Sequence, residues 1–437
     1  MSGINPFAEQ EVVSSTSLII ADLLIPGRGE PIKDAALVFN GGRILYVGGK
    51  DQMPEIYTLL PATRLPVVMP GLWDCHVHML GHVHFSGTAI WNLNPVIAGA
   101  RLIRDAAELL GAGFTSIRDC GGHGLLIDKV IQEGHMPGPK IYSCNALISQ
   151  TGGHADNHEL PLNVWRDACE KRVPCHLCDG PDECLKAVRL QLRQGANFIK
   201  VCASGGVGSP GDNPEHRQFS DLELEAMVAE ASRAERIVAA HCHGKSGIIA
   251  ALKAGAHTIE HGTYMDEECI KLMLEKGAIL VATRAINEAV KKQTQLLNPE
   301  SLKKFEKIEP QRRAAYAAAV KGGVKIALGS DFGVSIPGHH AGHGANALEL
   351  KCAVDAGMTP LQAIEAGTAN GPLTLGPQAP LSGELKEGYD ADFIAVAGNP
   401  LDDIEILTMP DNITHVWRGG KLYKSPGLPV VTSKLQK

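Results

Sequence analysis

The chain has 437 residues, of which 44% are hydrophobic and 20% are charged, and this balance excludes an intrinsically disordered protein. Its formal net charge of -7, without a cluster of basic residues, argues against a nucleic-acid partner. The length exceeds the needs of one small core and suits either one large barrel or two to three domains.

The first residues and the cysteines indicate a cellular compartment. The opening MSGINPFAEQEVV has neither the basic start nor the apolar stretch of a secretion signal. The apolar run at 17–26 is too short to span a membrane and contains Asp22. Eleven scattered cysteines, an odd number, are typical of reduced thiols. We therefore expect a cytoplasmic protein with no membrane partner.

The two ends of the chain share a β-rich pattern. Short apolar runs separated by glycines occupy 17–70, for example AALVFNGGRILYVGG, and a similar pattern returns after 380, for example ITHVWRGGKLYK. Glycines between such runs are typical of hairpins. We therefore predict that 1–70 and 380–437 together form one small β-sandwich domain.

Between these ends, 71–379 alternate apolar strand-like runs with amphipathic helical stretches. One of the helices should begin at Ser220, which is followed by Glu223 in the pattern of a capping box. Eight alternations predict an α/β fold, a (β/α)8 TIM barrel over 71–379. The eight runs are PGLWDCHVH, FTSIRDCGG, KIYSCNA, NFIKVCASGG, RIVAAHCHG, HTIEHGT, AILVATRA and VKIALGSD.

Polar residues gather at the carboxyl ends of these runs, the catalytic face of such barrels. His76 and His78 lie two residues apart on one strand, so their side chains point the same way. The others are Lys200, His241, His243, His261 and Asp331. Each alone has an ordinary explanation: a hydrogen-bonded core histidine, a lysine reaching water, or an aspartate capping a helix. Together on one rim, imidazoles and a carboxylate indicate a metal site.

These residues lie in motifs that resemble the metal-dependent amidohydrolase superfamily, and more narrowly its prolidase-like and imidazolonepropionase-related branch. The resemblance covers nearly the whole chain and implies a binuclear site, usually with two zinc ions. The ligands it implies are His76, His78 and Asp331 for one metal, His241 and His261 for the other, and Lys200, carboxylated by carbon dioxide, as the bridge. The matching stretches are MPGLWDCHVH, FIKVCASGGV, AAHCHGKSGI, TIEHGTY, IALGSDFGV, HGANALEL and GMTPLQAIEAGTANGP.

The chemistry of amide hydrolysis explains these residue types. A metal lowers the pKa of bound water from 15.7 to about 7 and polarises a carbonyl. Burial of Lys200 between Ile199 and Val201 should disfavour the ammonium, so that the free amine can add carbon dioxide. Asp331 is expected to accept the proton of the attacking water and pass it to the leaving amine. His243 is expected to stabilise the substrate carbonyl or the tetrahedral oxyanion.

Four further residues are candidates for binding the substrate. His154, in TGGHAD, matches a motif of the family near the substrate. Arg284 ends the seventh run, where a guanidinium could clamp a carboxylate, and Lys245 offers a second cation. Tyr264, just past the sixth run, could line the same pocket. The ordinary alternatives are a loop histidine facing water and a salt bridge within the barrel.

We therefore expect an enzyme, a binuclear metal-dependent hydrolase that cleaves the amide bond of a small N-acyl amino acid or dipeptide, as prolidases and carboxypeptidases do. Hydrolysis of a cyclic amide, as in imidazolonepropionase or hydantoinase relatives, is one alternative. A non-catalytic scaffold is another, disfavoured because all six expected ligands are present. The absence of G-x-S-x-G leaves serine hydrolase chemistry unsupported, and SGGVGSPG lacks the Lys-Ser/Thr of a P-loop. We also expect a homo-oligomer.

Overall fold

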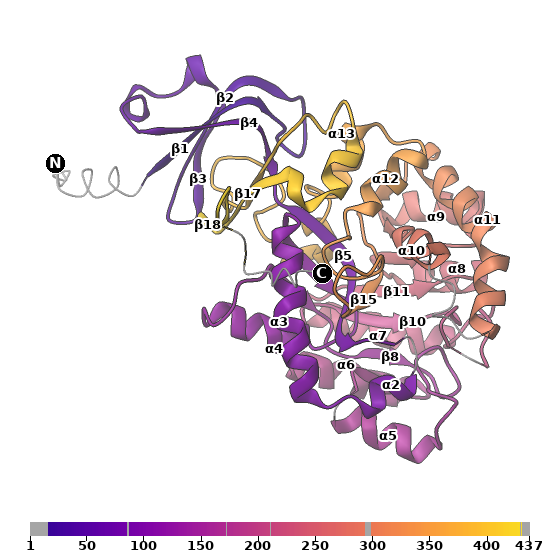
Figure 1. Ribbon diagram of the computed structural model, residues 1–437. Helices are drawn as coiled ribbons and strands as arrows, with labels where there is room; N and C mark the ends of the chain where they lie inside the picture. The colour runs from indigo at the N-terminus through magenta and orange to yellow at the C-terminus, as the bar shows by residue number, and fades with distance from the viewer. Residues whose placement is uncertain are drawn as a thin grey trace, which may run out of the picture.

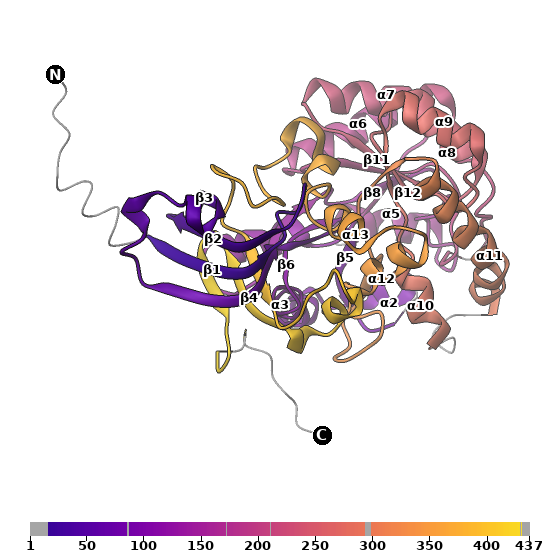
Figure 2. The ribbon, with the colours of Figure 1, turned by 90° about the horizontal axis from the view of Figure 1, so that it is seen from above.

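The structure, a computed structural model, describes residues 16–84, 87–171, 173–209, 211–292, 299–428 and 430. Its first and last described parts lie together as a sheet, and the middle of the chain forms a barrel surrounded by helices (Figure 1). Seen from above, the indigo and yellow segments occupy one side of the molecule and the magenta and orange segments the other (Figure 2).

Strands from both chain ends share one seven-stranded sheet, in the order β18-β17-β16-β4-β1-β2-β3. The end of the chain joins its beginning where β16 pairs antiparallel with β4, which in turn runs parallel to β1. Leu37, Phe393 and Trp417 are among its buried core residues. The strands are β1 (Ser17–Leu24), β2 (Ile32–Asn40), β3 (Arg43–Gly49), β4 (Ala62–Pro70), β16 (Phe393–Val396), β17 (Ile413–Arg418) and β18 (Lys421–Lys424). A two-layer sandwich with the boundaries given above stays a prediction.

Parallel strands from the middle of the chain form the barrel in two groups, β15-β5-β6-β7 and β14-β13-β12-β11-β10-β8-β9. Backbone hydrogen bonds close the ring: Cys75 N donates to Leu328 O at 2.8 Å, and Asn197 N donates to Ser143 O at 2.8 Å. The strands are β5 (Leu72–His82), β6 (Phe114–Asp119), β7 (Lys140–Ser143), β8 (Leu147–Ser149), β9 (Cys175–Leu177), β10 (Ile199–Cys202), β11 (Val238–Cys242), β12 (Thr258–His261), β13 (Ile279–Val281), β14 (Lys325–Ile326) and β15 (Phe332–Val334). The prediction of a TIM-barrel-like α/β fold is therefore confirmed.

All eight predicted runs contain a barrel strand, but three short strands were not predicted. β8 and β9 belong to the long segment after β7, and β15 follows Asp331 and pairs with β5. Their few residues carry too little pattern to be recognised in a sequence. By pairing with barrel strands, these three strands keep the connecting segments close to the rim that carries the polar residues.

Helices surround the barrel (Figures 1 and 2). The predicted capping box is present at the start of α7: the Ser220 side chain accepts from Glu223 N, and the Glu223 carboxylate accepts from Ser220 N at 2.6 Å. No helix in the described part of the chain is long and apolar enough to cross a membrane. All eleven cysteines are unpaired thiols, as expected. The helices are α2 (Gly87–Asn92), α3 (Pro95–Gly111), α4 (Gly124–Gln132), α5 (Leu162–Lys171), α6 (Pro181–Arg193), α7 (Asp221–Arg233), α8 (Lys245–Ala254), α9 (Glu267–Lys276), α10 (Ala285–Lys292), α11 (Pro299–Lys321), α12 (Leu348–Asp355) and α13 (Pro360–Ala366).

A buried ion pair crosses the barrel interior. Arg118 on β6 and Glu260 on β12 are both fully buried, with Nη2 and Oε1 2.5 Å apart. Arg118 Nε also donates to Cys75 O at 2.6 Å. Burial raises the pKa of Glu260, but Arg118 and His76 bring it well below its usual range, so the group is a carboxylate. Each of the two charges therefore offsets the cost of burying the other in the core.

We expect Arg118→Met to lower the free energy of unfolding by about 3–5 kcal/mol, because it leaves the Glu260 carboxylate buried without its main partner. The double variant Arg118→Met/Glu260→Gln should recover part of that loss. Urea denaturation of the wild type and both variants at pH 7 measures the two effects. A single variant as stable as the wild type would contradict the interpretation of a mutually dependent pair.

Candidate active site

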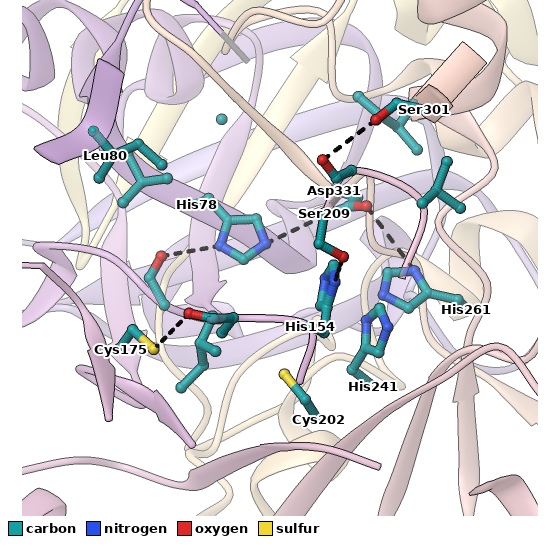
Figure 3. Close-up of a pocket in the computed structure, with 18 of the residues that line it drawn as sticks. His78, Leu80, His154, Cys175, Cys202, Ser209, His241, His261, Ser301 and Asp331 are labelled. Carbon is teal, nitrogen blue, oxygen red and sulfur yellow. Dashed lines mark hydrogen bonds and ion pairs between the residues drawn. The ribbon is translucent and has the colours of Figure 1, made fainter. Parts of the chain in front are cut away.

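The carboxyl ends of the barrel strands bring the predicted polar residues together at one rim. His76 and His78 lie on β5, Lys200 on β10, His241 at the end of β11, and His261 at the end of β12. Parallel strands present their carboxyl ends on the same face, so these side chains share one space. Figure 3 shows His78, His154, His241, His261 and Asp331 around this cavity.

The first cluster of possible metal ligands consists of His76, His78 and Asp331. Asp331 Oδ1 lies 3.2 Å from Nε2 of His78 and 3.5 Å from Nε2 of His76. Burial raises the pKa of Asp331, but the hydrogen bond with His78 and the neighbouring imidazole of His76 bring it below its usual range. The group is therefore a carboxylate at neutral pH and suits a divalent cation.

The second cluster of possible metal ligands consists of His241, His243 and His261. Their ring centroids lie 4.6–4.8 Å apart. Burial is the largest cause that holds the pKa of all three well below the usual value, so the imidazoles are neutral, as metal ligands must be. The structure thus places His243 beside two residues implied as ligands, whereas the sequence analysis assigned it to the substrate.

Oxygen atoms behind the imidazoles fix their orientation. Four histidines place Nδ1 within hydrogen-bond distance of an oxygen, which leaves Nε2 for the cavity. The pairs are His76 with Glu260 (2.7 Å), His78 with Gly121 O (2.9 Å), His243 with Thr263 (2.7 Å) and His261 with Thr283 (2.7 Å). His241 has the opposite arrangement, because its Nε2 faces Gly205 O at 3.2 Å and Nδ1 is left for a metal.

Lys200 is 3% exposed, and its Nζ lies 3.3 Å from Nε2 of His76. Burial lowers the pKa of this amine, but Cys120, Glu260 and Cys202 raise it, and the net direction is upward. Burial alone therefore does not leave a free amine at Lys200 in the metal-free protein. A carboxylated Lys200 needs the positive charge of bound metals to reverse the preference for the ammonium.

His154 lies beside the second cluster, with its ring stacked on His241 at 4.2 Å between centroids. Its Nδ1 is 2.8 Å from Oγ of Ser209, which donates to Asp212 at 2.7 Å. A Cβ added to Gly206 would lie 2.0 Å from Cε1 of His154, so the glycine-rich run after Lys200 lets the backbone approach this imidazole. That run therefore has a packing role.

We expect Gly206→Ala to lower kcat/KM by about 10²-fold, because the added methyl displaces His154 by roughly 1 Å or more from the cavity. The measurement is steady-state kinetics on an amide that the wild type hydrolyses. Gly99→Ala on α3 is the control, since Gly99 does not line the cavity and nothing lies within 4 Å of its added Cβ. Wild-type activity in Gly206→Ala would contradict a role for the position of His154.

Three of the predicted substrate-binding residues lie outside the cavity. Arg284, Lys245 and Tyr264 are not among the described residues that line the cavity. The Arg284 guanidinium, 4% exposed, lies 2.6 Å from a carboxylate oxygen of Glu309, and Lys245 Nζ lies 2.6 Å from one of Asp266. The prediction of a carboxylate clamp from these two cations is corrected, because each positive charge already has a carboxylate partner within the chain.

The cavity has a volume of about 370 Å³ and is lined by two groups of apolar residues, here called its two walls, which come from different elements. The first wall comes from α2, α5 and the segment around β8 and β9, and consists of Ile90, Leu147, Trp165, Val173 and Cys175. The second comes from α10 and α11, and consists of Ile286, Val290, Phe305 and Ile308. A ligand with an apolar group on each side of a polar centre fits this lining.

The sequence analysis missed Arg312, a cation of α11 that lines the cavity. Arg312 is 4% exposed, whereas the side chain of the neighbouring Arg313 is 62% exposed. Burial lowers the pKa of Arg312 to about 10, so it remains charged at neutral pH. The apolar stripe of this helix includes Phe305, Ile308 and Ala315, and position 312 falls on it, a signal that could have identified the residue.

Residues 67–423 match the model of the Amidohydrolase family. The match covers more than half of the chain, and the chain therefore belongs to this family. The resemblance inferred from the strand-end motifs is confirmed.

Among known proteins, ochratoxinase of Aspergillus niger is 46% identical over 440 residues, covering 95% of this chain and 89% of the relative. The crystal structure of A. niger ochratoxinase superposes with a TM-score of 0.88 at 45% identity, over 96% of this chain and 98% of that chain. A crystal structure of a Xaa-Pro dipeptidase with bound methionine in the active site gives a TM-score of 0.83 at 30% identity, over 94% and 100%. Imidazolonepropionase of Acinetobacter baumannii is 26% identical over 424 residues, covering 91% and 94%. The prediction of an enzyme that hydrolyses amide bonds is confirmed.

Proposed function

We propose that the chain hydrolyses the amide bond of an N-acyl amino acid or dipeptide with a free carboxylate. The observation that carries this proposal is the cavity itself, in which possible metal ligands lie between two apolar walls and beside a buried cation. Similarity to ochratoxinase and to a Xaa-Pro dipeptidase supports the same substrate class. One apolar wall suits the acyl group and the other suits the side chain of the amino acid.

The donor set fits two divalent metal ions, which we propose to be zinc. His76, His78 and Asp331 would hold one ion, and His241 and His261 the other. Neutral imidazoles and a carboxylate are ligand types that zinc prefers. When bound, the two ions would lower the pKa of water and polarise the amide carbonyl.

Lys200 lines the cavity beside His76 of the first cluster, and we propose that it is carboxylated and bridges the two metal ions. Its Nζ is 3.3 Å from the nearest ligand nitrogen, that of His76. The ammonium first loses one proton to solvent. The neutral amine then attacks carbon dioxide, so that the N–C bond forms as one C=O π bond breaks to give a carboxylate oxygen, and the nitrogen releases a second proton to solvent. When bound, two divalent cations would favour the resulting anion over the ammonium.

Residues of the chain carry out the proton transfers and the substrate contacts of the hydrolysis. Asp331 accepts a proton as water adds to the amide carbon, and it returns that proton to the nitrogen as the carbon–nitrogen bond breaks. Its pKa, below the usual range, keeps it unprotonated before the water attacks. We propose that His243 accepts from the Thr263 hydroxyl at Nδ1 and donates from Nε2 to the substrate carbonyl or the oxyanion, and that His154 contacts the substrate.

Metal content and Lys200 are tested together. Elemental analysis of the zinc-reconstituted protein should give about two ions per chain. Chelation should abolish hydrolysis and zinc should restore it. Lys200→Ala should lower kcat by about 10²-fold or more, and short carboxylic acids should restore part of it by replacing the bridging anion. A fully active protein with one ion, or a fully active Lys200→Ala variant, would contradict the bridged binuclear site.

Substrate class is tested by a hydrolysis screen of the zinc-loaded protein. N-acyl-phenylalanines, proline dipeptides and ochratoxin A should be cleaved with a kcat/KM about tenfold or more above that for hydantoins and carboxyl-blocked analogues, because the latter lack the proposed carboxylate contact. The readout is released amino acid. If cyclic or carboxyl-blocked amides are hydrolysed best, the N-acyl amino acid proposal fails and hydrolysis of cyclic amides replaces it.

A further inference from the structure

Four cationic side chains are buried in the described part of the chain: Arg118, Lys200, Arg284 and Arg312. Arg118 pairs with Glu260 and Arg284 with Glu309 and Glu288. Lys200 lies among the possible metal ligands. Arg312 differs from the others, because no carboxylate of the described residues forms an ion pair with it.

The contacts of Arg312 are all with neutral groups. Its Nη2 donates to Thr283 O at 2.7 Å, to Ala282 O at 3.1 Å and to the Thr283 hydroxyl, and its Nη1 donates to Asn287 Oδ1. Its buried Nε donates to no group of the described residues. These contacts hold the guanidinium in place, and the carboxylates of Asp331, Glu349 and Glu309 act on it at longer range without forming an ion pair. A buried charge with no direct partner is unfavourable, so the site suits an anion supplied by a ligand.

The position of Arg312 indicates where that anion would lie. Arg312 lines the cavity, and its Nη2 is 3.4 Å from Nδ1 of His261. It belongs to α11, which also supplies Phe305 and Ile308 to the second apolar wall. Figure 3 shows His261 and Ser301 on one side of Asp331, and Leu80 and Cys175 on the other side of the cavity. The cation and the second wall thus lie on the same side of the reacting centre.

We propose that Arg312 binds the carboxylate of the leaving amino acid and thereby orients the substrate. This inference rests on the proposed function. The amino acid then lies toward α10 and α11, with its side chain against Ile286, Val290 and Phe305. The acyl group lies toward Leu147 and Trp165. Arg312 is a specificity-determining residue in this arrangement, in the role that the sequence analysis gave to Arg284.

Arg312 also has a structural contact that the test must separate. It donates to the Thr283 hydroxyl, whose Oγ1 is 2.7 Å from Nδ1 of His261. A purely structural role would act through His261, and its loss would lower metal content and the hydrolysis of every substrate alike. Binding of a carboxylate affects only substrates that carry one.

The test compares N-acyl-L-phenylalanine with the N-acyl amide of 2-phenylethylamine, which has the same leaving side chain and no carboxylate. For the first substrate, Arg312→Gln should raise KM by about tenfold to a hundredfold with little change in kcat, because a charge-assisted contact is lost. For the second substrate, neither constant should change. Zinc content should stay at the wild-type value. Arg313→Gln, the exposed neighbour, is the matched control and should behave as wild type.

Equal losses on both substrates, or a fall in zinc content, would overturn the proposal. If Arg312→Gln does not fold, Arg312→Lys keeps the charge without the guanidinium fork and should raise KM for the carboxylate substrate only, by a smaller factor. If the wild type cleaves neither substrate, the proposed function fails separately. Calorimetric binding of phenylalanine, compared with 2-phenylethylamine, to the wild type and Arg312→Gln then decides the role of Arg312, and equal phenylalanine affinity in both proteins would overturn it.

Discussion

One buried carboxylate, that of Glu260, connects the core of the barrel to its rim. One of its oxygens lies 2.5 Å from Arg118 Nη2, and the other lies 2.7 Å from Nδ1 of His76. The first contact keeps a charge stable inside the barrel, and the second turns Nε2 of His76 toward Asp331 and Lys200. The geometry of the rim therefore depends on an ion pair in the core, and a change in that pair reaches the site without any contact with substrate.

The rim brings neutral imidazoles and an ionised carboxylate together. Burial keeps the imidazoles of His241, His243 and His261 neutral, and Asp331 is ionised. The imidazoles of His241 and His261 and the carboxylate of Asp331 line one cavity, an arrangement that cations stabilise. In the proposed binuclear site the same cations would also change the state of Lys200, so that metal loading and lysine carboxylation depend on each other. Bicarbonate supply and metal supply would then act on activity together.

The sequence predicted correctly the site features that follow from the alternation of side chains along one strand. His76 and His78 share a face because strand side chains alternate, and the barrel order brings β5, β10, β11 and β12 to one rim. It did not identify what depends on partners far along the chain. Arg284 has the same chemistry as Arg312, but its charge is paired with the carboxylates of Glu288 and of Glu309, the latter 25 residues away on α11. The pKa of Lys200 likewise depends on side chains of other strands, which its apolar neighbours in sequence do not reveal.

Anomalous X-ray diffraction at the zinc edge, on crystals of the zinc-loaded protein grown with bicarbonate, tests the central claim most directly, because it locates each ion against named residues. The account predicts two peaks, one at His76, His78 and Asp331 and one at His241 and His261, with added density on Nζ of Lys200 between them. One peak, or two peaks with an unmodified Lys200 ammonium, in crystals that hydrolyse the amide would contradict it.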